Sequence, residues 1–119
     1  MFSGVYRDGD SNELRVAAID DKTLDVHYCG THATAAGGIN MGDARGQATL
    51  GGNVATFRPP DTGSCTITIA FERGTAKVTQ KGSSGQCALG HGVDATGIYA
   101  KVQAGNPDML EEFFCVSGR

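Results

Sequence analysis

Tryptophan is absent from the 119-residue sequence, and phenylalanine and tyrosine together make up only 7% of it. Charged residues are also sparse, at 19%, whereas glycine occurs 18 times. A chain of this length forms one domain, and its core must be built from small aliphatic residues and a few aromatic ones. We therefore expect residues 1–119 to form a single domain.

Long apolar runs and an excess of basic residues are missing as well. No run of about 18 apolar residues occurs, so the sequence predicts no membrane-spanning helix. The 13 acidic residues outnumber the 10 basic ones and give a formal charge of −3. This charge argues against nucleic acid or an anionic membrane as the partner.

The hydrophobic pattern that is present has a period of two, which is typical of β-strands with one buried face. The predicted strands are 2–6, 13–18, 23–28, 46–50, 53–58, 65–72, 75–80 and 97–102. Short polar or glycine-containing connections join several of them, as in antiparallel hairpins. Strands near the two chain ends could pair and so remove the sheet edges. The predicted fold is all-β, a single antiparallel β-barrel or sandwich of seven to eight strands.

Two segments depart from this pattern. Residues 30–42 are rich in Gly, Ala and Thr, and we expect a loop with at most one irregular strand. Asn106, Pro107 and Asp108 are suited to the start of a helix, which predicts a short C-terminal helix. Its apolar face would consist of Met109, Leu110, Phe113 and Phe114.

Four cysteines in a short glycine-rich chain fit a disulfide framework, which forms in oxidising compartments. Three pairings are open, and we favour Cys65–Cys87 because one strand, one turn and a second strand lie between them. In the chain-entropy description such a closure stabilises by about 3 kcal/mol. Cys29 and Cys115 would form the second pair or remain free thiols. Met1 is not followed by a signal peptide, which fits either a cytosolic protein or a mature domain from which that peptide has been removed. Because of the cysteines we expect the second, a periplasmic or secreted domain.

Known catalytic templates do not fit the sequence. The nucleophile motif G-x-S-x-G is absent, and the paired acids Asp20-Asp21 and Glu111-Glu112 are neighbours that would point to opposite faces of a strand. Residues 8–12 resemble the start of a calcium loop but lack its glycine and its final glutamate, so they are better interpreted as a turn. We expect no enzyme and no cofactor.

Two short-spaced pairs, Cys29 with His32 and Cys87 with His91, contain residue types that bind zinc. They keep open an alternative function, a β-barrel that binds a small ligand or a metal. This alternative requires free thiols, because a sulfur in a disulfide cannot bind the metal as a thiolate.

A binding role is the remaining hypothesis. The glycine-rich loop 82–94 carries Ser83, Ser84, His91 and Asp94, and we expect these residues to contact a partner. Loops held by a rigid sheet are where binding residues are usually found.

The segments CTITIAF (65–71), CALGHGV (87–93) and GIY (97–99) are similar to those of small periplasmic β-proteins of Gram-negative bacteria. Ser3-Gly4-Val5-Tyr6 resembles, with one residue fewer, the Ser-Gly-x-x-Tyr motif of periplasmic lysozyme inhibitors. The second motif of that family, with Tyr and Thr-Lys-Gly, has no match here. In the family the first motif lies on a loop that enters the lysozyme cleft, so the resemblance implies that Ser3 and Tyr6 bind the partner. The resulting hypothesis is a periplasmic or secreted protein that inhibits a peptidoglycan hydrolase by loop insertion.

Overall fold

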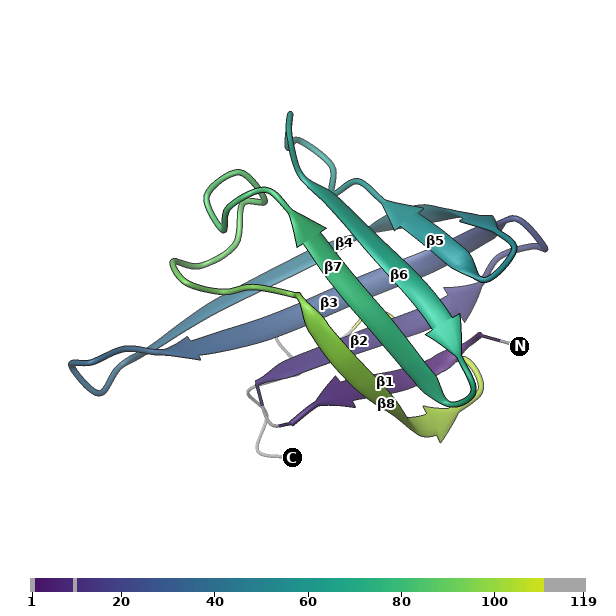
Figure 1. The fold of residues 1–119 in the computed structure, drawn as a ribbon, viewed down its shortest axis with the longest axis horizontal. Coiled ribbons are helices and arrows are strands. Elements are labelled where there is room, and N and C mark those ends of the chain that lie inside the picture. Colours follow the sequence, from purple (N-terminus) through teal and green to yellow (C-terminus); the bar gives the residue numbers. More distant parts are fainter. Residues whose placement is uncertain (1, 10, 111–119) are drawn as a thin grey trace.

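The fold is an eight-stranded antiparallel barrel in which each strand pairs with the next along the chain (Figure 1). It is described from a computed structural model that covers residues 2–9 and 11–110. The strands are β1 (Gly4–Asp8), β2 (Asn12–Ala18), β3 (Thr23–Ala33), β4 (Ile39–Gly51), β5 (Val54–Phe57), β6 (Thr66–Glu72), β7 (Thr75–Lys81) and β8 (Gly97–Ala104).

The two terminal strands close the barrel, as expected from the sequence. Strand β1 pairs with β8 from Gly4 opposite Ala104 to Arg7 opposite Ala100, with one irregularity after Val5. The all-β prediction and the upper strand count of eight are therefore confirmed. The sandwich alternative is wrong, because the sheet is continuous around the ring.

The predicted hairpins are present. Strands β2 and β3 place Val16 opposite Val26, and β6 and β7 place Ile69 opposite Val78. Gly74 forms the β6–β7 turn with a φ of 72°, a conformation that glycine adopts without steric cost. The period of two therefore predicted these strand pairs correctly.

The predicted loop at 30–42 is wrong, because most of this segment belongs to two long strands. Strand β3 continues to Ala33 and β4 starts at Ile39, with pairs that run out to this end of the hairpin. Only residues 34–38 form the connection, where the Thr34 amide donates to the Gly38 carbonyl at 2.8 Å. The residues at both ends of the predicted loop thus belong to a two-stranded ribbon that projects from the barrel, and the remaining Thr, Ala and Gly residues form its tip (Figure 1).

The short C-terminal helix is not seen. Residues 106–110 are not helical, and residues 111–119 lie outside the described part of the chain. Asp108 explains the difference: its side chain accepts from the Leu110 amide at 2.9 Å, and its carbonyl accepts from Arg15 Nη1 at 2.7 Å. These contacts form a local turn and attach it to the barrel wall. No helix that could cross a membrane occurs in the described ranges.

Alternating residues of the strands fill the interior of the barrel. The largest buried side chains are those of Tyr6, Tyr28, Tyr99, Phe57, Leu14, Leu24, Ile67 and Ile69. Each tyrosine hydroxyl donates to a protein acceptor. Tyr6 donates to the Phe2 carbonyl, Tyr28 to the Asn12 side-chain oxygen and Tyr99 to the Ala95 carbonyl. The interior is thus a packed core in which the polar groups of the tyrosines are hydrogen-bonded.

Candidate functional site

The two ends of the barrel differ in how they are closed. We call the end that carries residues 34–38 and the connection 82–96 the hairpin end. The opposite end, where Phe2 and the β2–β3, β4–β5 and β6–β7 turns lie, is called the Phe2 end. All candidate site residues lie at or near one of these two ends.

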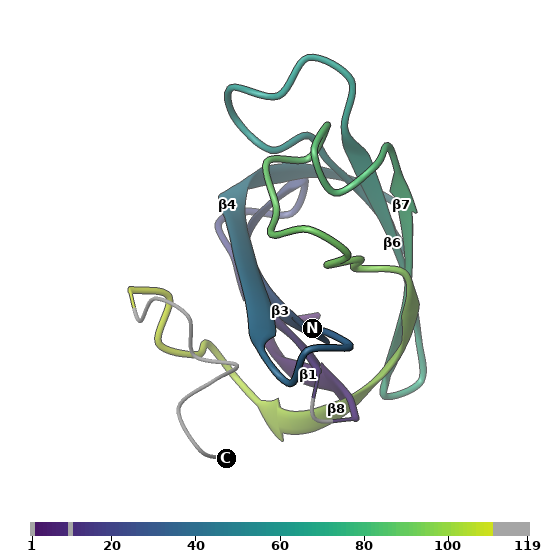
Figure 2. The same ribbon diagram turned by 90° about the vertical axis from the view of Figure 1, so that its left-hand side faces the viewer.

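The connection 82–96 closes the hairpin end and is named here the plug loop. Figure 2 shows it crossing the opening of the barrel. Its apolar side chains are buried and belong to the main core: Cys87, Leu89, Val93 and Ala95. The segment expected to be a flexible recognition loop therefore contributes core residues.

The polar residues predicted on this loop support its own turns. Ser83 Oγ accepts from the Gln86 amide at 3.2 Å, and Ser84 Oγ accepts from the Gly92 amide at 3.3 Å. Asp94 Oδ1 accepts from the Thr96 amide at 2.9 Å. These contacts are typical of Ser and Asp in tight turns.

His91 has an exposed side chain, and its carbonyl accepts from Asn40 Nδ2 at 2.8 Å. This bond joins the plug loop to the start of β4. The hairpin and the plug loop therefore lie at the same end of the barrel and are in contact, which the sequence did not reveal.

Ser3 and Tyr6 lie at the Phe2 end, away from the plug loop. Ser3 Oγ accepts from the Ala18 amide at 2.9 Å, and Tyr6 is only 2% exposed. Burial raises the pKa of Tyr6 to about 12, because the charged phenolate is disfavoured away from water. The structure thus separates the six predicted contact residues into two groups and places Tyr6 in the core.

A disulfide fixes the plug loop. Cys65, which precedes β6, is bonded to Cys87 with a Cα–Cα distance of 4.9 Å, and both residues are buried. The predicted pairing is confirmed. Cys29 is also disulfide-bonded, but its expected partner Cys115 lies outside the described residues, so that pairing stays a prediction.

The proposed zinc ligands do not form a metal site. Because Cys29 and Cys87 are both in disulfides, neither can offer a thiolate. His32 and His91 remain as exposed imidazoles at the hairpin end. Within residues 2–9 and 11–110, no three His, Cys, Asp or Glu side chains are grouped so as to hold a metal ion.

The β3–β4 hairpin extends beyond its neighbours on both sides. Strand β2 pairs with β3 only as far as Gly30, and β5 pairs with β4 only as far as Ala48. Beyond Gly30 the ribbon carries exposed apolar side chains, with Ile39 63% and Met41 43% exposed. Because these two residues are two positions apart on one strand, their side chains lie on the same face of the ribbon.

Close packing at its base holds the hairpin against the plug loop. A Cβ on Gly42 would lie 2.7 Å from the Gly90 amide nitrogen, and a Cβ on Gly90 would collide with the Met41 carbonyl. The two backbones can approach this closely because neither Gly42 nor Gly90 carries a Cβ. The base of the hairpin is therefore fixed to a loop that is itself held by a disulfide.

A buried ionic cluster on the outer wall of β1–β3 was not predicted. Glu13, 2% exposed, accepts from Arg7 Nε at 2.7 Å and from Arg15 Nε at 2.8 Å. His27 Nε2 lies 2.9 Å from Asp43 Oδ2 on the same face. The sequence pattern of β2 could have indicated this cluster. Glu13 and Arg15 alternate with the core residues of the strand, so both side chains must point to the outside of the barrel. We interpret the cluster as structural, because it joins the strands and binds the 106–110 segment through Arg15.

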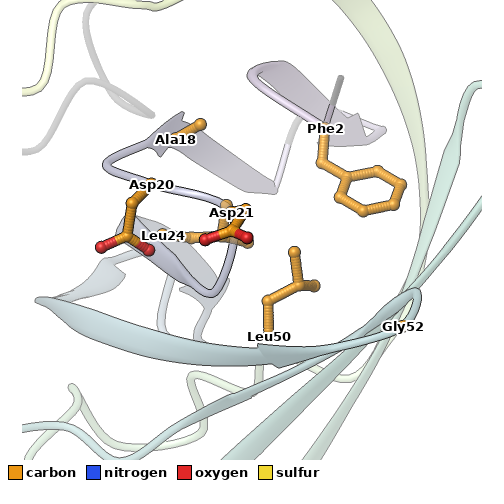
Figure 3. Close-up of a pocket in the computed structure, with 7 residues that line it drawn as sticks. All are labelled: Phe2, Ala18, Asp20, Asp21, Leu24, Leu50 and Gly52. Carbon is orange, nitrogen blue, oxygen red and sulfur yellow. The ribbon is translucent and has the colours of Figure 1, made fainter.

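The Phe2 end contains a pocket of about 350 Å³ (Figure 3). Its lining residues are Phe2, Ala18, Asp20, Asp21, Leu24, Leu50 and Gly52. A second hollow of about 230 Å³ also borders Phe2 and is lined by Tyr6, Phe71, Glu72, Arg73, Gly74, Thr75 and Lys101. Neither pocket was predicted, because residues far apart in the chain form their walls.

Comparison with protein-family models, curated proteins and solved structures finds no match to this chain.

Proposed function

We propose that this protein is an extracytoplasmic binding protein whose projecting β3–β4 hairpin enters a cleft of a protein partner. The observation that carries the proposal is the exposure of Ile39 and Met41 on a ribbon that continues past β2 and β5. The fixed base favours binding as well, because a preorganised element loses little entropy when it docks.

The disulfides support an oxidising compartment, and with it a periplasmic or secreted location. The resemblance to periplasmic lysozyme inhibitors then suggests a peptidoglycan hydrolase as the partner. Such enzymes bind an extended polysaccharide in an elongated cleft, and a two-stranded ribbon with strands about 5 Å apart is narrow enough to enter one. A charge of −3 would modestly accelerate association with a basic enzyme.

In this proposal the inserted element differs from the one that the lysozyme-inhibitor motif implies. Tyr6 is inside the barrel, and its hydroxyl donates to the Phe2 carbonyl at 2.7 Å. In this proposal it holds the N-terminal segment at the Phe2 end and does not contact the partner. The hairpin tip, residues 34–38, takes the inserted position because it extends farthest from the barrel (Figure 1).

The test is an inhibition assay against a panel of muramidases and peptidoglycan amidases, with the protein in micromolar excess. We expect at least one enzyme to lose activity, and Ile39→Asp to weaken inhibition by about tenfold, as for a central interface residue. The matched control is Ile98→Asp on β8, which changes an equally apolar residue that is 67% exposed on a strand that pairs with neither β3 nor β4.

Two results would contradict the proposal. One is full activity of every enzyme in the panel, which would remove the hydrolase partner. The other is equal loss of inhibition in Ile39→Asp and Ile98→Asp, which would place the interface away from the hairpin.

A further inference from the structure

The 350 Å³ pocket at the Phe2 end has the composition of a small-molecule site rather than of a packing defect. Most of its wall is apolar, and its ionisable groups are two adjacent carboxylates. Its volume falls in the range of known ligand pockets, about 300–1,000 Å³. It lies at the other end of the barrel from the hairpin, so it is independent of the function proposed above.

The apolar side of the pocket is well supported by the core. The Phe2 ring stacks on Phe71 at a centroid distance of 4.5 Å and an interplanar angle of 12°. Leu24 is buried and Leu50 packs against the same core from β4. Figure 3 shows the Phe2 ring and the Leu50 side chain facing the same space as the Asp21 carboxylate.

The polar side of the pocket is negatively charged. Asp20 Oδ1 accepts from the Lys22 amide at 2.9 Å, and this bond lowers the pKa of Asp20, so the group is ionised at neutral pH. Asp21 has no hydrogen-bond or ion-pair partner within the described residues. Lys22 belongs to the same turn but does not line the pocket, and no Lys or Arg among residues 2–9 and 11–110 does.

We propose that this pocket binds an amphiphilic amine, a molecule with an alkyl or aryl tail and a terminal ammonium group. The tail would contact Phe2, Leu24 and Leu50 and replace their contact with water. The ammonium group would lie beside Asp21, with the Asp20 carboxylate next to it in the same turn. An anionic amphiphile of the same length would meet two like charges at the same position.

The test compares three probes of equal chain length, n-octylammonium, octan-1-ol and octanoate, by titration into the ¹⁵N-labelled protein. We expect octylammonium to shift the amide signals of Asp21, Leu50 and Gly52. Octanol should bind more weakly at the same amides, and octanoate should leave them unchanged. Signals of Gly74 and Lys101, beside the smaller hollow, serve as an internal reference.

The double variant Asp20→Asn, Asp21→Asn should weaken octylammonium binding by about fivefold and leave octanol unchanged, because exposed ion pairs contribute modestly. Asn can still accept the Lys22 hydrogen bond, so the turn should persist. Asp61→Asn is the matched control, since it removes one charge from the β5–β6 connection at the hairpin end. The proposal is overturned if octylammonium does not shift the amide signals of Asp21, Leu50 and Gly52, or if octanoate binds there as tightly as octylammonium. It is also overturned if the double variant and Asp61→Asn bind octylammonium with equal affinity.

Discussion

Glu13 accepts a hydrogen bond from Arg15 Nε at 2.8 Å on the outer wall of the barrel, although both side chains are nearly buried there. Outward-facing residues of a small barrel are normally solvated. Here the Asp108 carbonyl accepts from Arg15 Nη1, so the segment after β8 lies against this part of the wall. The pair is thus part of a second, polar layer that lies outside the main core.

We expect Glu13→Gln to lower the free energy of unfolding by about 3 kcal/mol, because it removes the carboxylate charge that pairs with the nearly buried Arg15 guanidinium. The measurement is urea denaturation followed by far-UV circular dichroism. Glu72→Gln is the control, since Glu72 is exposed at the end of β6 and should have little effect. Equal effects of the two substitutions would mean that the Glu13 ion pairs contribute nothing beyond an exposed charge.

The Cys65–Cys87 disulfide should stabilise the plug loop more than the rest of the barrel. The double variant Cys65→Ala, Cys87→Ala is expected to lose about 3 kcal/mol, the chain-entropy value for a loop of 22 residues. Amide hydrogen exchange should accelerate most in the plug loop, while β2 and β3 should be affected only through global unfolding. Uniform acceleration throughout the barrel would show that the disulfide does not hold the plug loop locally.

The sequence pattern was sufficient for most of the barrel wall. Hairpins such as β6–β7 are local, and Ile67, Ile69 and Val78 alternate with polar residues that face outward. Strand β4 was only partly predicted, because the buried positions of its first half, Gly42 and Ala44, carry small residues, whereas the larger apolar residues Ile39 and Met41 are exposed. This part of β4 pairs with the end of β3 but lacks the buried apolar face that defines an ordinary strand pattern.

The candidate sites depended on contacts that no local pattern contains. The plug loop was predicted to be a binding loop from its serines and glycines, which also serve tight turns. Its insertion into the barrel follows from Leu89 and Val93, two apolar residues in a segment without strand or helix periodicity. The Phe2-end pocket combines the segment before β1 with the β2–β3 and β4–β5 turns, which are distant in the chain, so only the closed topology could reveal it.

The contact between Gly90 and the Met41 carbonyl leads to a sharp test of how the hairpin is held. Gly90→Ala should destabilise the protein by about 2 kcal/mol, because the added methyl group forces the plug loop away from β4. The amide of Val93, which donates to the Gly90 carbonyl at 2.9 Å, should exchange faster with solvent. Gly51→Ala is the control, since a Cβ there meets no atom within 4 Å. If the two variants are equally stable, the hairpin is not fixed at this point.

The three buried tyrosines should make the barrel unfold at high pH. Burial raises the pKa of Tyr6 to about 12, and it raises those of Tyr28 and Tyr99 as well. In the unfolded chain each phenol ionises near pH 10, so the folded state binds these protons more tightly. The stabilisation is complete below about pH 10 and is lost as the pH rises toward 12 and beyond.

Because tryptophan is absent, absorbance at 295 nm reports tyrosinate alone. We expect the three phenols to ionise together in one step that coincides with loss of the circular dichroism signal. Tyr6→Phe should retain this coincidence and reduce the absorbance change by about a third, since it removes one of the 3 tyrosines. Ionisation of any tyrosine near pH 10 in a protein that keeps its circular dichroism would contradict the buried positions of these side chains, because a solvated phenol titrates at its ordinary pKa.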